Sequence, residues 1–345
     1  MAYTNIDDPS AHFQVKTYTG TSGIHDVTLD GNSDMQPDFV WFKNRDVGYV
    51  HHLYDSSRGV TKALYSSGTN AEATITNGLT QFHTDGFRVT SAAAVNENSI
   101  VCWNWKANGG TTSSNTDGSI TSTVQADTDA GFSIITYTGN ATNSTVGHGL
   151  GVQPSVIINK KRGSTASWSV WHSALLGTQL LELNTTGATA TVPAIWNSTV
   201  PTSSVFSIGT DGQTNSNNTT YVTYAFAEKQ GYSKFGKYTG NGNADGTFVY
   251  TGFKPAFVLV KSSSATHNWH ILDNKRDPEN VVDKYVNPDN DVAEATFTFG
   301  DFLSNGFKWR SSSGTSFNEN GTSYIYMAFA ENPFVTSTGI PTTAR

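Results

Sequence analysis

Two aspartates are each followed, three residues later, by an arginine: Asp55 by Arg58, and Asp273 by Arg276. Each pair comes directly after a short apolar segment. A carboxylate in that place can accept backbone N–H groups and pair with the guanidinium, an arrangement typical of a tight turn. The same two charges could instead line a polar pocket for a sugar. The spacing therefore predicts a repeated polar turn, with a sugar pocket as the alternative.

Aromatic side chains form the second group of interest, because their flat faces can stack on a glycan. The chain has 8 Trp, 14 Tyr and 19 Phe. Some tryptophans lie in dense apolar segments or recur at one distance after a proline, and we expect these in the core: Trp41, Trp103, Trp105, Trp168 and Trp269. Four aromatic residues are less constrained by their neighbours and are the predicted glycan-binding candidates: Tyr49, Tyr54, Trp196 and Trp309.

Catalytic patterns are sparse. A hydrolase needs two placed carboxylates or a nucleophile with its base, and no acidic pair recurs along the chain. Neither a Gly-x-Ser-x-Gly motif nor a glycine-rich phosphate loop occurs. We therefore expect a protein that is not an enzyme, with no catalytic residues and no cofactor.

Metal-binding patterns are equally weak. His51 and His52 are neighbours on a predicted strand, so their side chains point to opposite faces, and we expect them at the surface or in a loop. The run Asp30–Asp34 alternates oxygen ligands as a calcium loop does, but it lacks the glycine and the glutamate that such loops carry at positions 6 and 12. The sequence predicts no metal site. Cys102 is the single cysteine and is expected to be a buried thiol.

Composition excludes several classes of protein. The 345 residues include 21 Lys and Arg against 28 Asp and Glu, a formal charge of −7. Only 14% of residues are charged, against about 25% in ordinary soluble domains. Nucleic acid is not an expected partner, because no basic stripe is present. The aromatic content argues against disorder. No apolar run approaches the length of a membrane span, so membrane insertion is not expected, and residues 1–12 do not form a secretory signal.

The chain repeats itself three times. Tyr-Thr-Gly occurs at residues 18–20, 137–139 and 238–240. Each copy is followed by a proline that opens an apolar run ending in lysine: Pro37 to Lys43, Pro154 to Lys160 and Pro255 to Lys261. Eighteen residues after each proline stands a polar residue, namely Asp55, His172 and Asp273. The spacing predicts equivalent central strands in three copies of one unit.

The predicted fold is all-β, with three tandem antiparallel β-sandwich repeats of the jelly-roll type. Short apolar runs separated by Asp-Gly and Asn-Gly turns support it. The expected boundaries are residues 1–108, 131–230 and 231–345, with a Gly/Ser/Thr-rich linker at 109–130 that holds a strand near Ser119–Gln125. A helical turn is expected only at Val292–Ala295. Because the linker is long and polar, removal of residues 1–108 should leave a folded remainder.

Several longer motifs resemble tandem-repeat virion proteins of marine tailed bacteriophages, which are described as tail-fibre-like or of unknown function. The motifs are Gly147–Gly151 before Pro154, Asn70–Thr74, Asp301–Phe307 and Tyr326–Phe334. The resemblance extends from about residue 3 to Arg345. It implies a phage virion surface protein and supplies no catalytic residues. The second repeat departs from the pattern, with His172 and Leu175 in place of the Asp and Arg.

On this basis we expect a virion protein of the tail-fibre or appendage type, made in the host cytoplasm, which attaches to a host-cell glycan or receptor. The alternative is a capsid or tail decoration protein with a purely structural role, and a third interpretation is an envelope-glycan depolymerase. Expected partners are other virion proteins and the host surface. We also expect a homo-oligomer, specifically a trimer, because several copies of one weak glycan site bind more strongly together.

Overall fold

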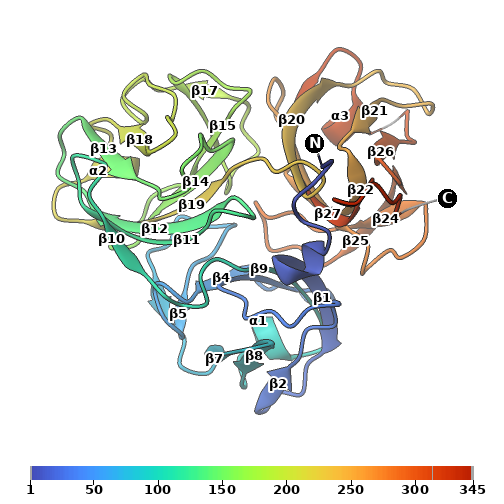
Figure 1. The fold of residues 1–345 in the computed structure, drawn as a ribbon, viewed down its shortest axis with the longest axis horizontal. Helices are drawn as coiled ribbons and strands as arrows, with labels where there is room; N and C mark the ends of the chain where they lie inside the picture. The colour runs from blue at the N-terminus through green and yellow to red at the C-terminus, as the bar shows by residue number, and fades with distance from the viewer. Residues whose placement is uncertain (1, 313, 343–345) are drawn as a thin grey trace.

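The computed structural model describes residues 2–312 and 314–342, and its strands are short and numerous. Strands make up 43% of the structure and helices 4%, so the chain is all-β, as predicted. Three lobes surround a common centre, coloured blue, green to yellow, and orange to red in Figure 1. We call them lobe 1 (strands within residues 13–105), lobe 2 (113–226) and lobe 3 (233–333).

Lobe 1 has an inner sheet toward the centre of the molecule and an outer sheet away from it (Figure 1). The inner sheet has the order β1 (Phe13–Thr19), β9 (Ser99–Trp105), β3 (Phe39–Asn44) and β4 (His52–Asp55). The outer sheet has the order β2 (His25–Val27), β8 (Gly86–Val89) and β7 (Leu79–His83). The lobe also contains η1 (Pro9–Ala11), the ribbon β5 (Lys62–Ala63) and β6 (Ala73–Thr74), and α1 (Ala93–Asn96).

Lobe 2 extends the same plan into a longer sheet. Its order is β10 (Ser113–Asn115), β11 (Ser122–Asp127), β12 (Phe132–Thr138), β19 (Thr220–Phe226), β14 (Val156–Lys161), β15 (Ser169–His172), β16 (Gln179–Glu182) and β17 (Ala190–Thr191). The second sheet pairs β13 (Ser144–Gly147) with β18 (Val205–Ile208), and α2 covers Gly212–Asn215.

Lobe 3 has two four-stranded sheets. One has the order β20 (Ser233–Thr239), β27 (Ser323–Pro333), β22 (Phe253–Ser262) and β23 (His270–Asp273). The other has the order β21 (Phe248–Tyr250), β26 (Gly306–Trp309), β25 (Ala295–Leu303) and β24 (Val282–Tyr285), and α3 covers Thr315–Asn318.

One antiparallel strand order recurs in the three inner sheets: β1-β9-β3-β4, β12-β19-β14-β15 and β20-β27-β22-β23. The pairings Phe39 with Trp105, Val156 with Phe226 and Phe257 with Phe329 are equivalent. The apolar runs after the three prolines therefore lie between two neighbouring strands, as predicted. Pro255 lies inside β22 at a bulge, where its missing N–H disturbs the ladder least.

The core is largely a cluster of aromatic rings shared by the three lobes. Phe13 of lobe 1 stacks on Phe329 of lobe 3 with ring centroids 5.0 Å apart, and Phe39 stacks on Tyr224 of lobe 2 at 4.2 Å. Lobes 1 and 3 have additional clusters between their own two sheets. Burial of these rings is the main force that holds the lobes together.

The Tyr-Thr-Gly motif has a structural role. Its tyrosine hydroxyls donate to carbonyl groups of the short helices, Tyr137 to Thr214 and Tyr238 to Phe317, both at 2.7 Å. A side chain on Gly20 would come within 2.2 Å of the Asn96 backbone.

The short helices were not predicted, and the turn predicted at Val292–Ala295 is wrong. That segment runs against lobe 1, because the Glu294 N–H donates to the Arg45 carbonyl at 2.8 Å.

The polar linker is ordered against lobe 1. It contains the predicted strand, which appears as β11, and an additional strand, β10. The Asp38 carboxylate accepts the N–H groups of Ala107 and Gly109, both at 2.8 Å. The Gln125 side chain accepts the N–H of Gly110 at 2.8 Å. The linker therefore joins the lobes closely and does not act as a flexible tether.

Candidate functional site

The first predicted Asp–Arg pair fastens lobe 1 to lobe 2. Asp55 accepts the backbone N–H of Arg58 at 2.7 Å and also pairs with its guanidinium, and both side chains are fully buried. The Tyr224 hydroxyl of lobe 2 donates to Asp55 at 2.7 Å. Arg58 also pairs with Glu72, which reaches Arg162 of lobe 2 at 2.9 Å. The bonds are those of the predicted turn. The sugar-pocket alternative is wrong here, because neither side chain reaches solvent.

The second pair repeats this arrangement between lobe 3 and lobe 1. Asp273 accepts the N–H and the guanidinium of Arg276 at 2.9 and 2.7 Å, again with both side chains fully buried. The Trp103 indole of lobe 1 donates to Asp273 at 3.1 Å. Arg276 pairs with Glu294, and Glu294 pairs with Arg45 of lobe 1 at 2.8 Å. Trp103 and Tyr224 hold equivalent strand positions. We call the contact between two neighbouring lobes a seam, and these two seams are built alike.

The seam between lobes 2 and 3 has apolar and neutral groups at the positions where the other two seams have charged ones. His172 stands at the aspartate position and Leu175 at the arginine position. The residue equivalent to Trp103 and Tyr224 is Met327, which has no N–H or O–H to donate. His172 instead accepts the N–H of Ala174 at 3.0 Å and donates to the Tyr326 carbonyl of lobe 3 at 3.3 Å. A carboxylate at position 172 would keep a backbone N–H donor, but it would be buried with neither a guanidinium nor a donor at Met327.

Backbone hydrogen bonds show which residues of the third seam correspond to the outer glutamate and arginine of the other two. Glu72 donates its N–H to the Arg162 carbonyl at 2.9 Å, and Thr189 donates likewise to Ser263 at 3.0 Å across the third seam. Thr189 and Ser263 therefore replace the outer glutamate and arginine. A buried ion pair can be replaced by apolar groups at little cost when all of its members change together.

The repeated lysines also join lobes. Lys43 donates to the Asp291 carbonyl of lobe 3 at 2.9 Å, and Lys261 donates to the Thr186 carbonyl of lobe 2 at 2.9 Å. Lys160 donates to the Thr69 carbonyl between lobes 2 and 1 at 3.0 Å. Burial lowers the pKa of each lysine to about 8. These amines hold neighbouring loops and are closed off from solvent.

A third repeated position, fourteen residues after each proline, is occupied by His51, Trp168 and Trp269. Each donates to a backbone carbonyl of the adjacent lobe, at 3.1, 2.8 and 3.0 Å. The predicted surface location of His51 and His52 is wrong, because both are buried. Burial lowers the pKa of both imidazoles.

The predicted glycan-binding aromatics are mostly inaccessible. Tyr54, Trp196 and Trp309 are at most 2% exposed, so no sugar can stack on them, and this prediction is wrong for these three. They lie between sheets or loops that the sequence does not place. Tyr49 is half-buried in a loop beside the exposed Val47 and Val50. The five tryptophans expected in the core are buried, as predicted.

The aspartate that begins the possible calcium loop, Asp30, pairs with two lysines. Asp30 lies 3.3 Å from the amines of both Lys16 and Lys275. Within residues 2–312 and 314–342, no group of three or more His, Cys, Asp or Glu side chains could hold a metal ion. Cys102 is a free, buried thiol, as predicted, and burial raises its pKa to about 12.

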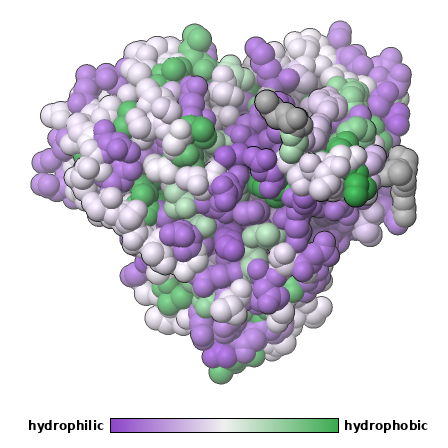
Figure 2. Space-filling model, in the orientation of Figure 1, coloured by the Kyte–Doolittle hydropathy of each residue, from purple (hydrophilic) through white to green (hydrophobic). Residues whose placement is uncertain are grey.

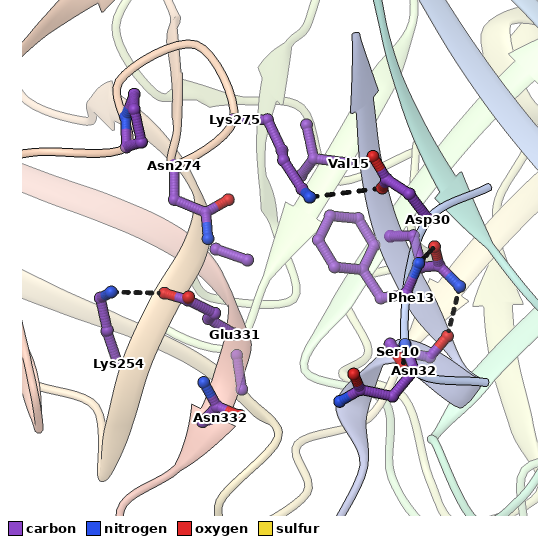
Figure 3. A pocket seen from close by; sticks show the side chains of 15 residues that line it. Ser10, Phe13, Val15, Asp30, Asn32, Lys254, Asn274, Lys275, Glu331 and Asn332 are labelled. Atoms are coloured by element: carbon purple, nitrogen blue, oxygen red, sulfur yellow. Dashed lines mark hydrogen bonds and ion pairs between the residues drawn. The ribbon is translucent and has the colours of Figure 1, made fainter. Parts of the chain in front are cut away.

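Two adjoining hollows remain as candidate binding sites. The first, which we call the seam cleft, has a volume of about 420 Å³ and lies between lobes 1 and 3 (Figure 3). Phe13 and Val15 of β1 form one wall, and Asn274, Lys275 and Glu331 of lobe 3 form the other. Figure 2 shows that hydrophilic residues gather along the middle of the face on which the three lobes meet.

The second hollow, the lobe-3 cleft, is larger, at about 660 Å³. It shares Lys254, Asn274 and Pro278 with the seam cleft. Its remaining lining is mostly polar and comprises Asp277, Glu279, Asn280, Phe302, Leu303, Ser304, Asn305 and Thr342. Such a wall can donate to and accept from neutral hydroxyl groups.

Two exposed aromatic side chains stand next to the lobe-3 cleft, and the sequence reasoning missed them. Phe248 and Tyr250 on β21 are 44% and 52% exposed, while Val249 between them is buried. Tyr250 pairs with Gly306, and Thr251 donates its N–H to the Asn305 carbonyl at 3.0 Å, which places this strand end beside the cleft. The alternation of aromatic, aliphatic and aromatic residues in a short strand is the signal that could have identified them.

Comparison with known proteins gives one family. A family model described as Domain of unknown function (DUF7483) matches residues 8–333, which include all three lobes. No curated protein and no solved structure matches the chain. Among the described residues, no helix is long and apolar enough to cross a membrane.

Proposed function

The chain belongs to the DUF7483 family, whose function is unknown, and we propose from the resemblance of its longer motifs that it is a bacteriophage virion surface protein of the tail-fibre or appendage type. Its role in this proposal is to attach the particle to a glycan or glycosylated receptor of the host cell. Binding, without a chemical step, is the proposed activity.

The lobe-3 cleft and its exposed aromatic pair are the observation that carries this proposal. Its volume of about 660 Å³ suits a short oligosaccharide. Asn280, Asn305 and Thr342 offer amide and hydroxyl groups to sugar hydroxyls. Phe248 and Tyr250 are exposed aromatic residues on the strand beside it, and aromatic rings can stack on a sugar. A low overall charge also suits a neutral ligand.

The same proposal includes the architecture. We propose that the three lobes are tandem copies of one jelly-roll-like β-sandwich. The recurring inner-sheet order and the equivalent contacts of the three lysines support this view. Equivalent sites need not be preserved in every copy, and the positions matching Phe248 and Tyr250 in lobe 1 are the polar residues Asp26 and Thr28.

We also propose that the chain forms a homo-oligomer, specifically a trimer. Its purpose would be to multiply weak glycan contacts through high effective concentration. The central aromatic rings are already enclosed within one chain, so the subunits would have to meet through the outer surfaces of the lobes. Sedimentation of the intact chain at micromolar concentration measures this directly.

A structural decoration role is the second candidate. It is favoured by the free edge of β1, which a neighbouring virion protein could use, and by the close fastening of all three seams. Labelling of intact particles separates the two roles, because a decoration protein would cover the capsid or tail uniformly.

The attachment proposal predicts a specific loss of binding. Replacing both Phe248 and Tyr250 by alanine should reduce binding to host envelope polysaccharide by about fivefold to a hundredfold, because two stacking faces are lost, each worth about 0.5–1.5 kcal/mol. Thr28→Ala, at the matching exposed position in lobe 1, should bind like the parent. The melting temperatures of all three proteins should agree. Unchanged binding by the double variant would contradict the proposal.

A further inference from the structure

We propose that the seam cleft is the seat of an extended peptide segment from a partner protein, which adds to the free edge of β1 as an antiparallel strand. This docking site adjoins the proposed glycan site, with which it shares Lys254, Asn274 and Pro278, but the proposal does not depend on glycan binding. It follows from a comparison of the seam cleft with the corresponding seam between lobes 1 and 2.

At the seam between lobes 1 and 2, the corresponding position is occupied by a strand of the chain itself, β11. β1 and β12 are equivalent, since Phe13 pairs with Trp105 as Phe132 pairs with Phe226. β12 has a second neighbour, β11, which pairs with it from Thr123 to Asp127. β1 is the last strand of its sheet, and no residue in the described part of the chain pairs with its outer edge.

The outer edge of β1 presents the same backbone groups as β12 does. The Lys106 N–H donates to the His12 carbonyl at 2.9 Å, as the Ala227 N–H donates to Gly131 at 2.7 Å. Because backbone groups alternate in direction along a strand, those of Phe13, Val15 and Thr17 face outward. A free edge of this kind is a template for another strand.

The corresponding outward-facing residues of β12 are those that meet β11. Phe132 lies opposite Asp127, Ile134 opposite Gln125, and Thr136 opposite Thr123. The pattern defines both the direction and the register expected for an added strand on β1.

Side chains on the far wall support the same seat. On β11, the Gln125 amide donates to the hydroxyls of Ser56 and Ser57 at 2.9 and 2.8 Å. The residues equivalent to this serine pair in lobe 3 are Asn274 and Lys275, which line the seam cleft (Figure 3). The Asn274 side-chain oxygen is buried and finds no hydrogen-bond partner among the described residues. A donor on an incoming strand, placed like Gln125, would satisfy it.

An incoming strand would have to displace only a weak ion pair to enter the cleft. Across its mouth, Lys275 pairs with Asp30 at 3.3 Å, and both side chains are more than 40% exposed (Figure 3). An exposed pair of this kind contributes about 0–1 kcal/mol and can be displaced. The partner we propose is an extended segment of about six residues that is uncharged at its centre and carries a carboxamide or hydroxyl side chain there, similar to Ser122–Asp127.

The edge of β20 provides a contrast within the molecule. It is equivalent to the β1 edge, but the Glu228 carboxylate accepts the outward N–H of Phe235 at 3.5 Å. Glu228 also pairs with Lys234 beside this edge. β20 is thus obstructed, and it supplies the matched control for the experiment.

The test uses the full chain and a synthetic peptide with the sequence of residues 119–127. We expect saturable binding, with slowed amide exchange at Phe13, Val15 and Thr17. A peptide N-methylated at Gln125, whose N–H would face β1, should bind at least tenfold more weakly. The peptide N-methylated at Val124, whose N–H faces away, should bind like the parent peptide.

Protein variants complete the test. Thr17→Pro removes an outward N–H of β1 without taking a ladder bond from β9, and it should abolish binding. Lys237→Pro, at the equivalent position of β20, should not. The proposal is overturned if the peptide fails to bind, if both N-methyl peptides bind equally, or if protection appears at β12 or β20. Self-association of the parent chain that Thr17→Pro abolishes would also overturn it, because the occupant would then be a second copy.

Discussion

Replacing Asp273 by asparagine should destabilise the protein strongly, although the substitution keeps the shape of the side chain. The carboxylate is fully buried and receives four hydrogen bonds, from the N–H groups of Lys275 and Arg276, the Arg276 guanidinium and the Trp103 indole. Asparagine leaves a buried guanidinium with Glu294 as its remaining charged partner. Loss of one partner from a buried ion pair costs about 3–5 kcal/mol.

The expected shift in melting temperature follows from the size of the chain. An unfolding entropy of about 2.1 cal/mol/K per residue gives roughly 0.7 kcal/mol/K for a chain of this length. A loss of 3–5 kcal/mol then lowers the melting temperature by about 4–7 °C. Thermal unfolding followed by tryptophan fluorescence reports on it directly, because the Trp103 indole lies at the altered seam.

The three seams provide internal controls for this experiment. Asp55→Asn should cost about as much as Asp273→Asn, because each network joins an aspartate, an arginine, a glutamate and an aromatic donor from the adjacent lobe. His172→Asn should cost about 1 kcal/mol or less, since Leu175 and Met327 require no charge from it. The reasoning would be refuted if Asp273→Asn melted within 1 °C of the parent, or if the histidine variant were equally damaged.

Two further predictions concern the lysines and the lobes. Burial lowers the pKa of Lys43, Lys160 and Lys261 to about 8, so the unfolded chain binds more protons above that pH. The unfolding free energy should therefore rise between pH 8 and 9.5, by up to about 2 kcal/mol per lysine, and Lys261→Met should remove about a third of the slope in denaturant titrations. The shared core reverses the expectation, drawn from the linker, that a chain without residues 1–108 stays folded. Removal of these residues should expose the rings of Tyr224 and Phe329, so the remainder should bind a hydrophobic dye and lose its near-ultraviolet dichroism. A remainder with native dichroism would contradict the shared core.

Repetition in the sequence carries most of the information about the fold. The distance from Pro37, Pro154 and Pro255 to each lysine places equivalent residues on equivalent strands, and the structure has these strands in the middle of their sheets. The polar turn of Asp55 and Arg58 is likewise evident from spacing, because its members are three residues apart. Such local patterns depend on backbone geometry that the sequence determines directly.

Contacts between lobes could not be predicted in the same way. Trp309 and Tyr54 resemble surface residues in the sequence, yet packing around them leaves them at most 1% exposed. The partner of Asp55 is Tyr224, 169 positions away, and the closing of three lobes around one centre brings them together. Nothing in the linker composition reveals that Asp38 and Gln125 hold it in place. These features depend on tertiary packing, which overrides local preference.

Joining three similar lobes in one chain allows each seam to become different, which identical subunits related by exact symmetry cannot do. Two seams are fastened by buried ions, and the third by His172, Leu175 and Met327. The three equivalent strand edges differ as well: β11 covers one, Glu228 obstructs another, and that of β1 faces a cleft. Residues shared by all lobes serve stability, as the lysines do. The departures from the repeat, at the edge of β1 and the exposed rings of β21, are therefore where binding to other molecules should be sought.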